Sequence, residues 1–531
     1  MNLYRVEIAV IGASLGGVIA AWRACVLGKR VALVAEFDWL GGQLTSQAVP
    51  PDEHRAIERG GAAASYLEFR RQMRAHYSAQ SGFVDRTALT EGCNPGDGWV
   101  SRLCIEPAVA ATYFEALLSP YVARGQLIIL RRSTLQATEI DTRNRRRIAA
   151  ISTVGAHTAR VEAAVFIDGT DSGELIASAG LKFRIGKEAQ AAFGELDAPT
   201  ASDENDQQPV TYVVALRRCA TAGVPIAKPL AYDFWRDYKL PQYPHPLFSN
   251  RAPGGTRGES IHLPFFAEGQ TLDWWRYRRI VCAHNWHSPR AEVSLVNWAQ
   301  NDYPLQPFIG ATKAQAEISD AAKALSRCWV YWLQTDAPRD GGTLGGRGYP
   351  ELQLATDMLG TTDGFAQQVY IRESRRIVGV ETLRQNDICF AGGAFDAVSR
   401  DDSVGVVWYN MDIHPTTVSG HGVNAKVRPF VLPLGVFIAA DCDNLIPGCK
   451  NISVTHLVNA ATRVHPSEWL IGEVAGHLAS GVLDAKTTLA EFAREHLRAF
   501  QAALTAAGIP LQWDALMVAH RSNNPAIQDT N

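Results

Sequence analysis

A short glycine-rich run between two apolar segments carries the clearest chemical pattern in the sequence. The apolar residues Ile8–Ile11 lead into Gly12-Ala13-Ser14-Leu15-Gly16-Gly17, and a second apolar segment ends at Glu36. A glycine turn that opens a helix presents free backbone N–H groups and a positive helix dipole to a phosphate. An acid after the second strand can accept the hydroxyls of a ribose. This order predicts a strand–helix–strand unit that binds a dinucleotide.

Each position of this turn that matches the glycine pattern has its own physical role. We expect Gly12 to make the tight turn and Gly17 to let the helix pack closely against the strands. Ser14 stands where the GxGxxG pattern has its middle glycine. Either its backbone approaches the phosphate less closely than glycine would, or its hydroxyl forms a hydrogen bond with the phosphate. The alternative is a structural turn that binds no ligand.

A second candidate group lies in the last fifth of the chain, where His456 and His465 flank a polar stretch that contains Arg463. A histidine, with an ordinary pKa of about 6.5, can take the proton of an alcohol or amine while a hydride leaves the neighbouring carbon. We therefore treat these three residues as catalytic candidates. In the alternative interpretation, backbone carbonyls satisfy both rings. The spacing of the histidines, without a carboxylate cluster, does not suggest a metal site.

Periodic patterns predict the elements that position these groups. Apolar and amphipathic runs predict helices over 62–81 and 107–123, strand-like runs over 127–130, 135–140, 148–154 and 159–165, and a strand over 164–167. The strand-like runs are typical of a β-meander. The last strand ends in an acid- and glycine-rich turn, Asp168 to Gly173, which we place in the same nucleotide-binding domain.

After Pro433 the chain is expected to return to that domain. Residues 444–454 are strand-like, 455–464 form a polar loop, and a helix runs from His465 and Pro466 through Ser480, with proline at a favourable first-turn position. Gly472 and Gly476 are four residues apart and predict a close helix–helix approach. A further amphipathic helix is predicted over 488–507, and the last dozen residues are polar and expected to fray.

The middle of the chain, from about 190 to 435, is rich in tryptophan and tyrosine, and in proline and glycine. Strands are predicted over 210–216, 368–372 and 377–383, in a mixed sheet. The aromatic residues either form a packed core, which we favour, or line a substrate site. We predict an inserted α+β substrate or cap domain over 191–433, a nucleotide-binding domain from 1–190 with 434–485, and a C-terminal helical tail over 486–531.

Composition excludes several other classes. The net charge of −3 gives no electrostatic footprint for nucleic acid or an anionic membrane, and no apolar run approaches the roughly 20 residues that span a bilayer. Nine cysteines without a C-x-x-C pair predict free thiols in a reducing compartment. We expect a cytoplasmic monomer or homodimer whose partners are a small-molecule substrate and an electron acceptor, oxygen or another, that the sequence does not identify.

With these segments in place, the sequence resembles the FAD-dependent oxidoreductases of the glutathione-reductase-like superfamily. The resemblance covers most of the chain. It is carried by residues 10–17, 40–45, 94–101, 166–175, 297–303, 370–377, 412–414 and 444–476. It implies an α/β fold in three layers, with a Rossmann-like FAD-binding domain that contains a parallel sheet and a β-meander, and an inserted α+β substrate or cap domain.

The resemblance also implies which residues contact FAD. They are Gly12, Ser14, Leu15, Gly17, Glu36, Gly41, Gly42, Gln43, Leu44, Thr45, Leu135, Gly169, Thr170, Asp171, Asn459, Glu468 and Trp469. The helix that begins near Pro466 is expected to point its N-terminus at the pyrimidine side of the flavin; an ordinary capped helix is the alternative. One stretch departs from the family pattern, because Gly448-Cys449-Lys450 stands where many relatives have a ribitol-binding Gly-Asp.

The expected reaction is hydride transfer between the flavin and a C–H bond next to an amine or alcohol of a small organic substrate. Two alternatives remain open. One is a flavin-dependent monooxygenase, which needs reduced flavin and oxygen. The other is a flavin-binding protein without catalytic activity. The sequence contains no G-x-S-x-G strand-to-helix elbow and no P-loop, which excludes the common hydrolase patterns.

Overall fold

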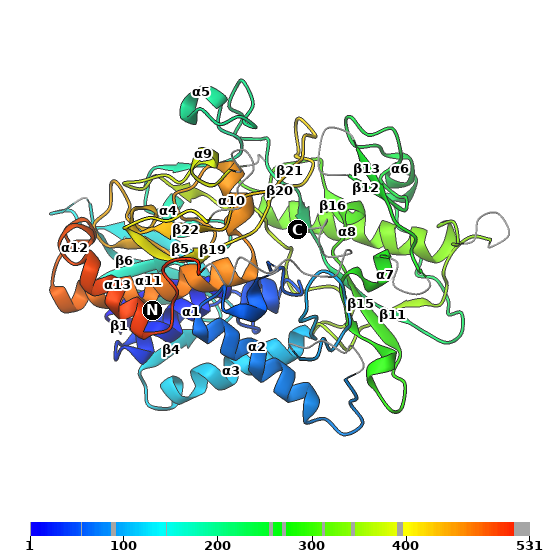
Figure 1. The fold of residues 1–531 in the computed structure, drawn as a ribbon, viewed down its shortest axis with the longest axis horizontal. Coiled ribbons are helices and arrows are strands. Elements are labelled where there is room, and N and C mark those ends of the chain that lie inside the picture. Colours follow the sequence, from blue (N-terminus) through cyan, green and yellow to red (C-terminus); the bar gives the residue numbers. More distant parts are fainter. Residues whose placement is uncertain are drawn as a thin grey trace.

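The computed structural model describes residues 2–54, 56–85, 92–144, 146–253, 259–267, 272–310, 314–340, 346–389 and 397–514. Two regions can be followed in Figure 1. Elements from both ends of the chain lie together on the left, and the middle of the chain, in green, lies on the right. The part of the predicted tail after residue 514, including the polar last dozen residues, lies outside the described residues.

A five-stranded parallel sheet forms the centre of the first region. Its strand order is β23 (Leu445–Pro447), β8 (Val165–Asp168), β2 (Ile8–Ile11), β3 (Val31–Val34) and β4 (Leu127–Leu130). All four pairings are parallel. The expectation that 127–130 belongs to the meander is wrong: this all-apolar segment suits a parallel sheet covered on both faces, and it forms one of the two edge strands.

Two further layers cover this sheet. On one face, β5 (Ser133–Ile140), β6 (Ile148–Gly155) and β7 (Ala159–Glu162) form an antiparallel meander that β1 (Asn2–Arg5) joins in parallel. Ala9 and Ile11 pack on that side, whereas Ile8 and Val10 pack on the side of α1 (Leu15–Val26) and α11 (His465–Ala485). Because alternate strand residues point to opposite faces, one short strand serves both layers. The predicted three-layer α/β fold class is confirmed.

Helices α1 and α11 approach each other closely through glycines. A Cβ atom at Gly472 would lie 2.1 Å from the Gly16 carbonyl oxygen, and one at Gly476 would lie 2.7 Å from that of Ala20. Any larger residue would push the helices apart. The close approach predicted from the spacing of Gly472 and Gly476 is therefore confirmed, and it fixes the start of α11 beside the start of α1.

Two predictions near the C-terminus, one of a loop and one of a helix, need correction. The expected polar loop over 455–464 is mostly a helix, α10 (His456–Thr462), because the Thr455 hydroxyl caps it by accepting the Val458 N–H at 3.4 Å. The expected helix over 488–507 is two helices, α12 (Leu489–Glu495) and α13 (Leu497–Ala506), with a break at His496. Helices α2 (Ala64–Ser78) and α3 (Pro107–Ala123) lie where they were predicted.

The second region is built on an antiparallel sheet and one long helix. The sheet has the order β14 (Arg279–Val281), β15 (Glu292–Val296), β11 (Val214–Arg218) and β17 (Leu352–Leu354), and α8 is Gln315–Thr335. The sheet is antiparallel, not mixed. Residues 368–372 contribute one isolated bridge, between Thr211 and Tyr370. Residues 377–383 contribute the end of β18 (Arg376–Ile377) and two isolated bridges, from Gly379 to Ala439 and from Leu383 to Val454, so neither segment forms a strand of its own.

Aromatic residues of this region form its core, as the favoured interpretation expected. Trp329 stacks on Trp332 with ring centroids 4.9 Å apart, and both belong to a buried cluster with Phe248 and Trp298. The remaining short elements are α4 (Glu174–Ser178), β9 (Phe183–Arg184), α5 (Gln190–Phe193), β10 (Val210–Thr211), α6 (Tyr232–Asp237), β12 (Arg251–Pro253), β13 (Ser260–His262), α7 (Trp274–Tyr277), β16 (Asp302–Tyr303), α9 (Gln385–Ile388), β19 (Ser403–Val407), β20 (Met411–Ile413), β21 (Val423–Ala425) and β22 (Phe430–Pro433).

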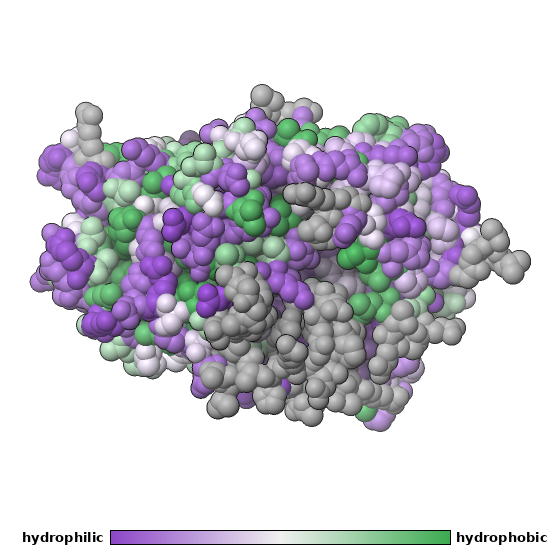
Figure 2. All heavy atoms as spheres, turned by 45° about the horizontal axis from the view of Figure 1, so that its top comes forward, coloured by the Kyte–Doolittle hydropathy of each residue, from purple (hydrophilic) through white to green (hydrophobic). Residues whose placement is uncertain are grey.

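The surface mixes polar and apolar side chains. On the face drawn in Figure 2, apolar side chains lie in small groups between polar ones. Among the described helices, none is long and apolar enough to cross a membrane. All nine cysteines are free thiols, and Cys219 and Cys389 are the two that are half-buried and not fully buried.

Candidate functional site

The glycine turn after β2 has the shape that the sequence predicts. Gly12 has a φ of +97°, and a Cβ atom there would lie 2.4 Å from the Gly169 carbonyl oxygen. A Cβ atom at Gly17 would lie 2.1 Å from the Gly12 carbonyl oxygen. Gly12 therefore makes the turn, and Gly17 lets α1 pack against it.

Ser14 is the N-cap of α1. Its Oγ accepts the N–H of Gly17 at 3.1 Å, and the neighbouring N–H of Gly16 donates to Glu468 Oε1, also at 3.1 Å. Two of the free N–H groups at this helix start are thus satisfied by side chains of the protein. The Glu468 carboxylate, from α11, supplies the negative charge that the α1 dipole favours.

A cavity of about 410 Å³ opens where β2, β3 and β8 end, the edge at which doubly wound sheets bind their ligands. Its opposite wall comes from the second region, with Tyr212, Phe308 and Gln315 at the start of α8. The cavity therefore lies between the two regions. Seven of the predicted cofactor residues line it: Gly12, Ser14, Glu36, Leu135, Gly169, Thr170 and Asp171.

Glu36 faces this cavity with an altered acidity. Loss of solvation among the surrounding protein atoms, followed by the nearby carboxylates of Glu174 and Asp171, raises the pKa of Glu36 from 4.5 to about 7. Three carboxylates thus share one wall of the cavity. A ligand that donates hydrogen bonds there stabilises the ionised form.

Beyond the cavity, a buried ion cluster joins four segments of the chain. Lys450 Nζ is hydrogen-bonded to Asp171 and lies 3.5 Å from Glu468 Oε2. Gln43 Nε2 donates to Glu468 at 2.5 Å, and Gln47 Nε2 donates to Asp171 at 2.8 Å. Burial lowers the pKa of Lys450, but the two carboxylates outweigh that effect and raise it well above the usual value. The lysine is therefore charged.

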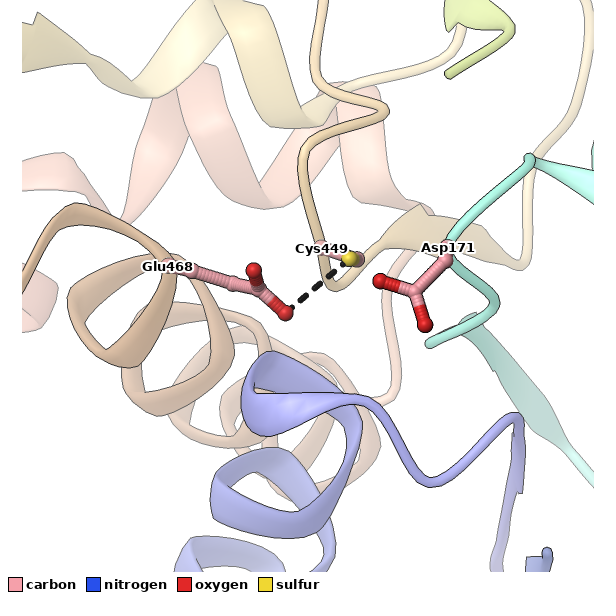
Figure 3. A group of neighbouring side chains, drawn as sticks. All are labelled: Asp171, Cys449 and Glu468. Atoms are coloured by element: carbon pink, nitrogen blue, oxygen red, sulfur yellow. Dashed lines mark hydrogen bonds between the residues drawn. The ribbon is translucent and has the colours of Figure 1, made fainter. Parts of the chain in front are cut away.

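Asp171, Glu468 and the thiol of Cys449 come together as a possible ligand set for a cation (Figure 3). Cys449 Sγ lies 3.1 Å from Glu468 Oε1 and 3.6 Å from Lys450 Nζ. Burial and the Glu468 charge raise the pKa of the thiol well above its usual value, so it is protonated. Because Lys450 already contacts this group, it supplies the positive charge that the two carboxylates need.

Three amide side chains around the cluster carry an unpaired oxygen. Gln43 Oε1, Gln47 Oε1 and Asn459 Oδ1 are buried and have no hydrogen-bond partner in the described structure. Buried polar atoms of native proteins nearly always have a partner. These oxygens fit a polar ligand with hydroxyl or N–H donors that extends from the cavity, which is what a bound dinucleotide offers.

His456 is held by a carboxylate. Its Nδ1 lies 2.7 Å from Glu188 Oε2, and the same carboxylate forms a salt bridge of 2.9 Å with Arg376. Burial raises the pKa of Glu188, but Arg376 and His456 outweigh it and hold that pKa well below the usual range. The ionised carboxylate fixes the Nδ1–H tautomer, which leaves Nε2 as the basic nitrogen of the ring.

His465 and Arg463 are engaged differently. His465 Nδ1 accepts the backbone N–H of Asp52 at 2.9 Å, and Nε2 faces the Val49 carbonyl at 3.2 Å. Burial lowers the pKa of His465 to about 4, so the ring is neutral. Arg463 donates to the Tyr370 hydroxyl at 2.8 Å and to the Asp412 carbonyl at 3.0 Å. The three catalytic candidates thus contact three different sets of partners.

Other predicted residues lie behind the cavity wall. Trp469 is 1% exposed and packs against Tyr66 and Phe69 in the helical core. Gly41 and Gly42 have positive φ values in the turn after Glu36. Leu15, Leu44 and Thr45 are buried next to that turn. The sequence reasoning missed Glu188 and Asp52, and it noted Lys450 only as a departure from the family pattern.

Fold and site together define a class: a protein with a Rossmann-like domain, in which a glycine turn lies at a cavity between two regions of the molecule. The chain belongs to the FAD dependent oxidoreductase family, whose model matches residues 7–504. Its cofactor is therefore FAD, and the protein is an oxidoreductase. No curated protein matches the sequence.

Solved structures with detectable similarity include L-proline dehydrogenase from P. horikoshii, at 14% identity over 41% of this chain and 62% of that chain with a TM-score of 0.26. They also include a geranylgeranyl bacteriochlorophyll reductase-like protein from Thermoplasma acidophilum, at 10% identity over 96% and 85% with a TM-score of 0.34. A third is THI4 from Thermovibrio ammonificans, at 16% identity over 37% and 76% with a TM-score of 0.23. The chain spans less than two thirds of the length of the first.

Proposed function

We propose that the protein oxidises a small organic molecule at a C–H bond next to an amine or alcohol, or catalyses the reverse reduction. The observation that carries this proposal is the cavity between the carboxyl edge of the parallel sheet and the second region. A cofactor bound at the glycine turn would lie under a wall formed by the second region, which shields its adenosine half from solvent. FAD supplies the hydride acceptor for such a reaction when it is bound.

We further propose the domain division stated above: 1–190 with 434–485, 191–433, and a tail over 486–531. Its support is that β23, from 445–447, pairs with β8, although more than 250 residues separate them. We also propose that the protein is a member of the glutathione-reductase-like superfamily. The three-layer arrangement of meander, parallel sheet and helices supports this assignment.

The proposed FAD contacts are the predicted residues of the cavity and the ion cluster. The glycine turn and Glu36 would hold the adenosine half, and Gln43, Gln47 and Asn459 would offer unpaired oxygens to the other half. Lys450 keeps this part of the site from becoming strongly negative despite the carboxylates of the buried Glu468 and the half-buried Asp171.

Among the catalytic candidates, the geometry favours His456 as the proton acceptor. Oxidation removes a hydride from carbon and a proton from the nitrogen or oxygen, and it leaves a C=N or C=O bond. The Glu188 contact at 2.7 Å orients the His456 ring. Both nitrogens of His465 are engaged by backbone groups, so we propose that His465 positions the Asp52 segment.

The first test is the absorption spectrum of the purified protein, followed by an anaerobic screen of amines and alcohols. We expect a two-band oxidised-flavin spectrum that an amine or alcohol bleaches without a nicotinamide cofactor. If bleaching requires a reduced nicotinamide and oxygen is then consumed, the monooxygenase alternative is favoured. A colourless protein that cannot be reconstituted with FAD contradicts the proposal.

A matched pair of substitutions tests the roles of the two histidines. His456→Asn keeps a donor toward Glu188 but removes the basic nitrogen, so we expect flavin reduction to slow by about 10²- to 10⁴-fold, with normal FAD content. His465→Asn keeps the acceptor for Asp52, so we expect the reduction rate to keep its pH profile. The rate and its pH profile are measured by anaerobic stopped-flow absorbance. A normal rate in His456→Asn rules out His456 as the acceptor.

A further inference from the structure

Two buried arginines from separate segments lie beside a group of tyrosines. Arg463, which follows α10, donates from Nη1 to the Tyr370 hydroxyl at 2.8 Å. Arg278, which follows α7, donates from Nη2 to the Tyr277 hydroxyl at 3.3 Å. These four residues come from both regions of the molecule.

The two arginines share charged and polar neighbours. Asp52, Tyr370 and Tyr409 act electrostatically on the guanidinium groups of both Arg278 and Arg463. Tyr277 and Tyr409 are half-buried, whereas the arginines are 6% and 3% exposed. We refer to this group as the two-arginine site: Arg278, Arg463, Tyr277, Tyr370 and Tyr409.

Neither arginine is fully satisfied by its carboxylate. Arg278 lies 3.2 Å from Asp52, and Arg463 lies 3.3 Å from Asp412, longer than the roughly 2.7–2.9 Å of a strong arginine–carboxylate contact. The Nε atoms of both arginines are buried and have no hydrogen-bond partner in the described structure. Leaving such donors unpaired is costly. The guanidinium groups of both arginines can therefore donate further hydrogen bonds to another acceptor.

The charge around the site also favours an anion. Arg372 lies 3.0 Å from Asp302, and His414 lies 2.5 Å from Asp302 and 3.6 Å from Asp412. Burial and Arg372 lower the pKa of His414, but the two carboxylates outweigh them and raise it. Among the described residues, four basic groups face three carboxylates: Arg278, Arg372, Arg463 and His414 against Asp52, Asp302 and Asp412.

We propose that the two-arginine site binds a carboxylate of the substrate, so that the substrate is a small organic acid such as an amino acid or a hydroxy acid. This inference rests on the proposed function. Arginine forks match the two oxygens of a carboxylate, and the tyrosine hydroxyls add donors. The site adjoins the start of α11, because His465 accepts the N–H of Asp52, the carboxylate partner of Arg278.

The test is calorimetric titration of the FAD-loaded protein with acetate and benzoate, each compared with its neutral amide. We expect at least one carboxylate to bind about tenfold more tightly than its amide. Arg463→Lys keeps the charge but loses the fork, and we expect it to weaken carboxylate binding about tenfold. Tyr370→Phe should weaken it about threefold. The control is Arg217→Lys, at a surface pair with Asp357 in the same region, which should bind as wild type does.

The outcomes separate this inference from the proposed function. If neither carboxylate binds more tightly than its amide, the two-arginine site is wrong, even if a neutral amine or alcohol bleaches the flavin. If the carboxylate preference is found but no amine or alcohol reduces the flavin, the proposed reaction is wrong and the site stands. If Arg463→Lys loses FAD, Tyr370→Phe decides, because it changes no charge: unweakened carboxylate binding in that variant overturns the inference.

Discussion

The glycine turn and the buried ion cluster around Lys450, which lie side by side at the start of α1, are built in different ways. One continuous segment, residues 8–36, supplies the strand, the turn, the helix start and the acid of the first. In the second, Gln43, Asp171, Lys450 and Glu468 come from four segments and meet through side-chain charges. Shape therefore determines the first, and charge balance determines the second. Substitutions should act on the two by different physical routes.

The largest effect is expected at the turn itself, with Gly12→Val. A β-branched residue at a φ of +97° is strained by about 1–3 kcal/mol, and its Cβ, 2.4 Å from the Gly169 oxygen, adds overpacking of about 1–3 kcal/mol. We expect FAD to be lost. The measurements are the FAD released by acid per protein and the urea midpoint.

The control for this variant is Gly125→Asn, which follows α3 with a φ of +72° and no atom within 4 Å of a Cβ. Asparagine tolerates this conformation, so we expect unchanged FAD content. Full FAD content in Gly12→Val would remove the glycine turn from the proposed cofactor site.

The same contrast explains what could be predicted from the sequence. The turn, α1 and the bounds of α3 follow from local patterns of apolar residues, glycine and a first-turn proline, and the structure has them as predicted. The Lys450–Asp171 contact joins residues 279 positions apart, and no local pattern encodes it. The same reason explains why the sequence alone predicts Leu127–Leu130 in the meander. A run of four apolar residues fits either sheet, and only its pairing with β3 decides between them.

The second largest effect is expected when the cluster loses its cation, in Lys450→Met. This leaves the buried Glu468 and the half-buried Asp171 without a positive partner, which costs about 3–5 kcal/mol. Adding Asp171→Asn should recover part of the loss, because one uncompensated charge is removed. Urea unfolding of the two single variants and the double variant measures the coupling.

Lys323→Met is the matched control, because Lys323 pairs with Asp363 at 2.8 Å near the surface. Its expected cost is below about 1 kcal/mol. Equal costs for Lys450→Met and Lys323→Met would show that charge balance does not determine the cluster.

A smaller effect is expected from pH, through Glu36. Its ionised form accepts ribose hydroxyls in the proposed complex, and its pKa is raised from 4.5 to about 7. We therefore expect the affinity of the apoprotein for FAD to increase about tenfold between pH 6 and pH 8, as the ionised fraction grows. Conversely, the raised pKa contributes stability to the FAD-free protein below pH 4.5, and that contribution is lost as pH rises through about 7. Glu36→Gln should flatten the affinity profile, measured by flavin fluorescence quenching; an unchanged slope would place the titration elsewhere.

The smallest effect separates two roles of Ser14, a helix cap or a phosphate ligand. If Ser14 is a cap that accepts the Gly17 N–H, Ser14→Ala should lower the free energy of unfolding by about 1 kcal/mol, and Ser14→Gly by only a few tenths. Thr488→Ala, which removes the cap of α12 far from the cavity, provides the scale for the alanine variant. Ser14→Gly also restores the missing glycine of the pattern, so its FAD affinity decides between the two roles. An affinity within about threefold of wild type fits a cap, because the backbone still reaches the phosphate, whereas a larger loss means that the hydroxyl itself binds the ligand. In that case a side chain of the turn also binds the ligand directly, and only Gly12 and Gly17 act through shape alone.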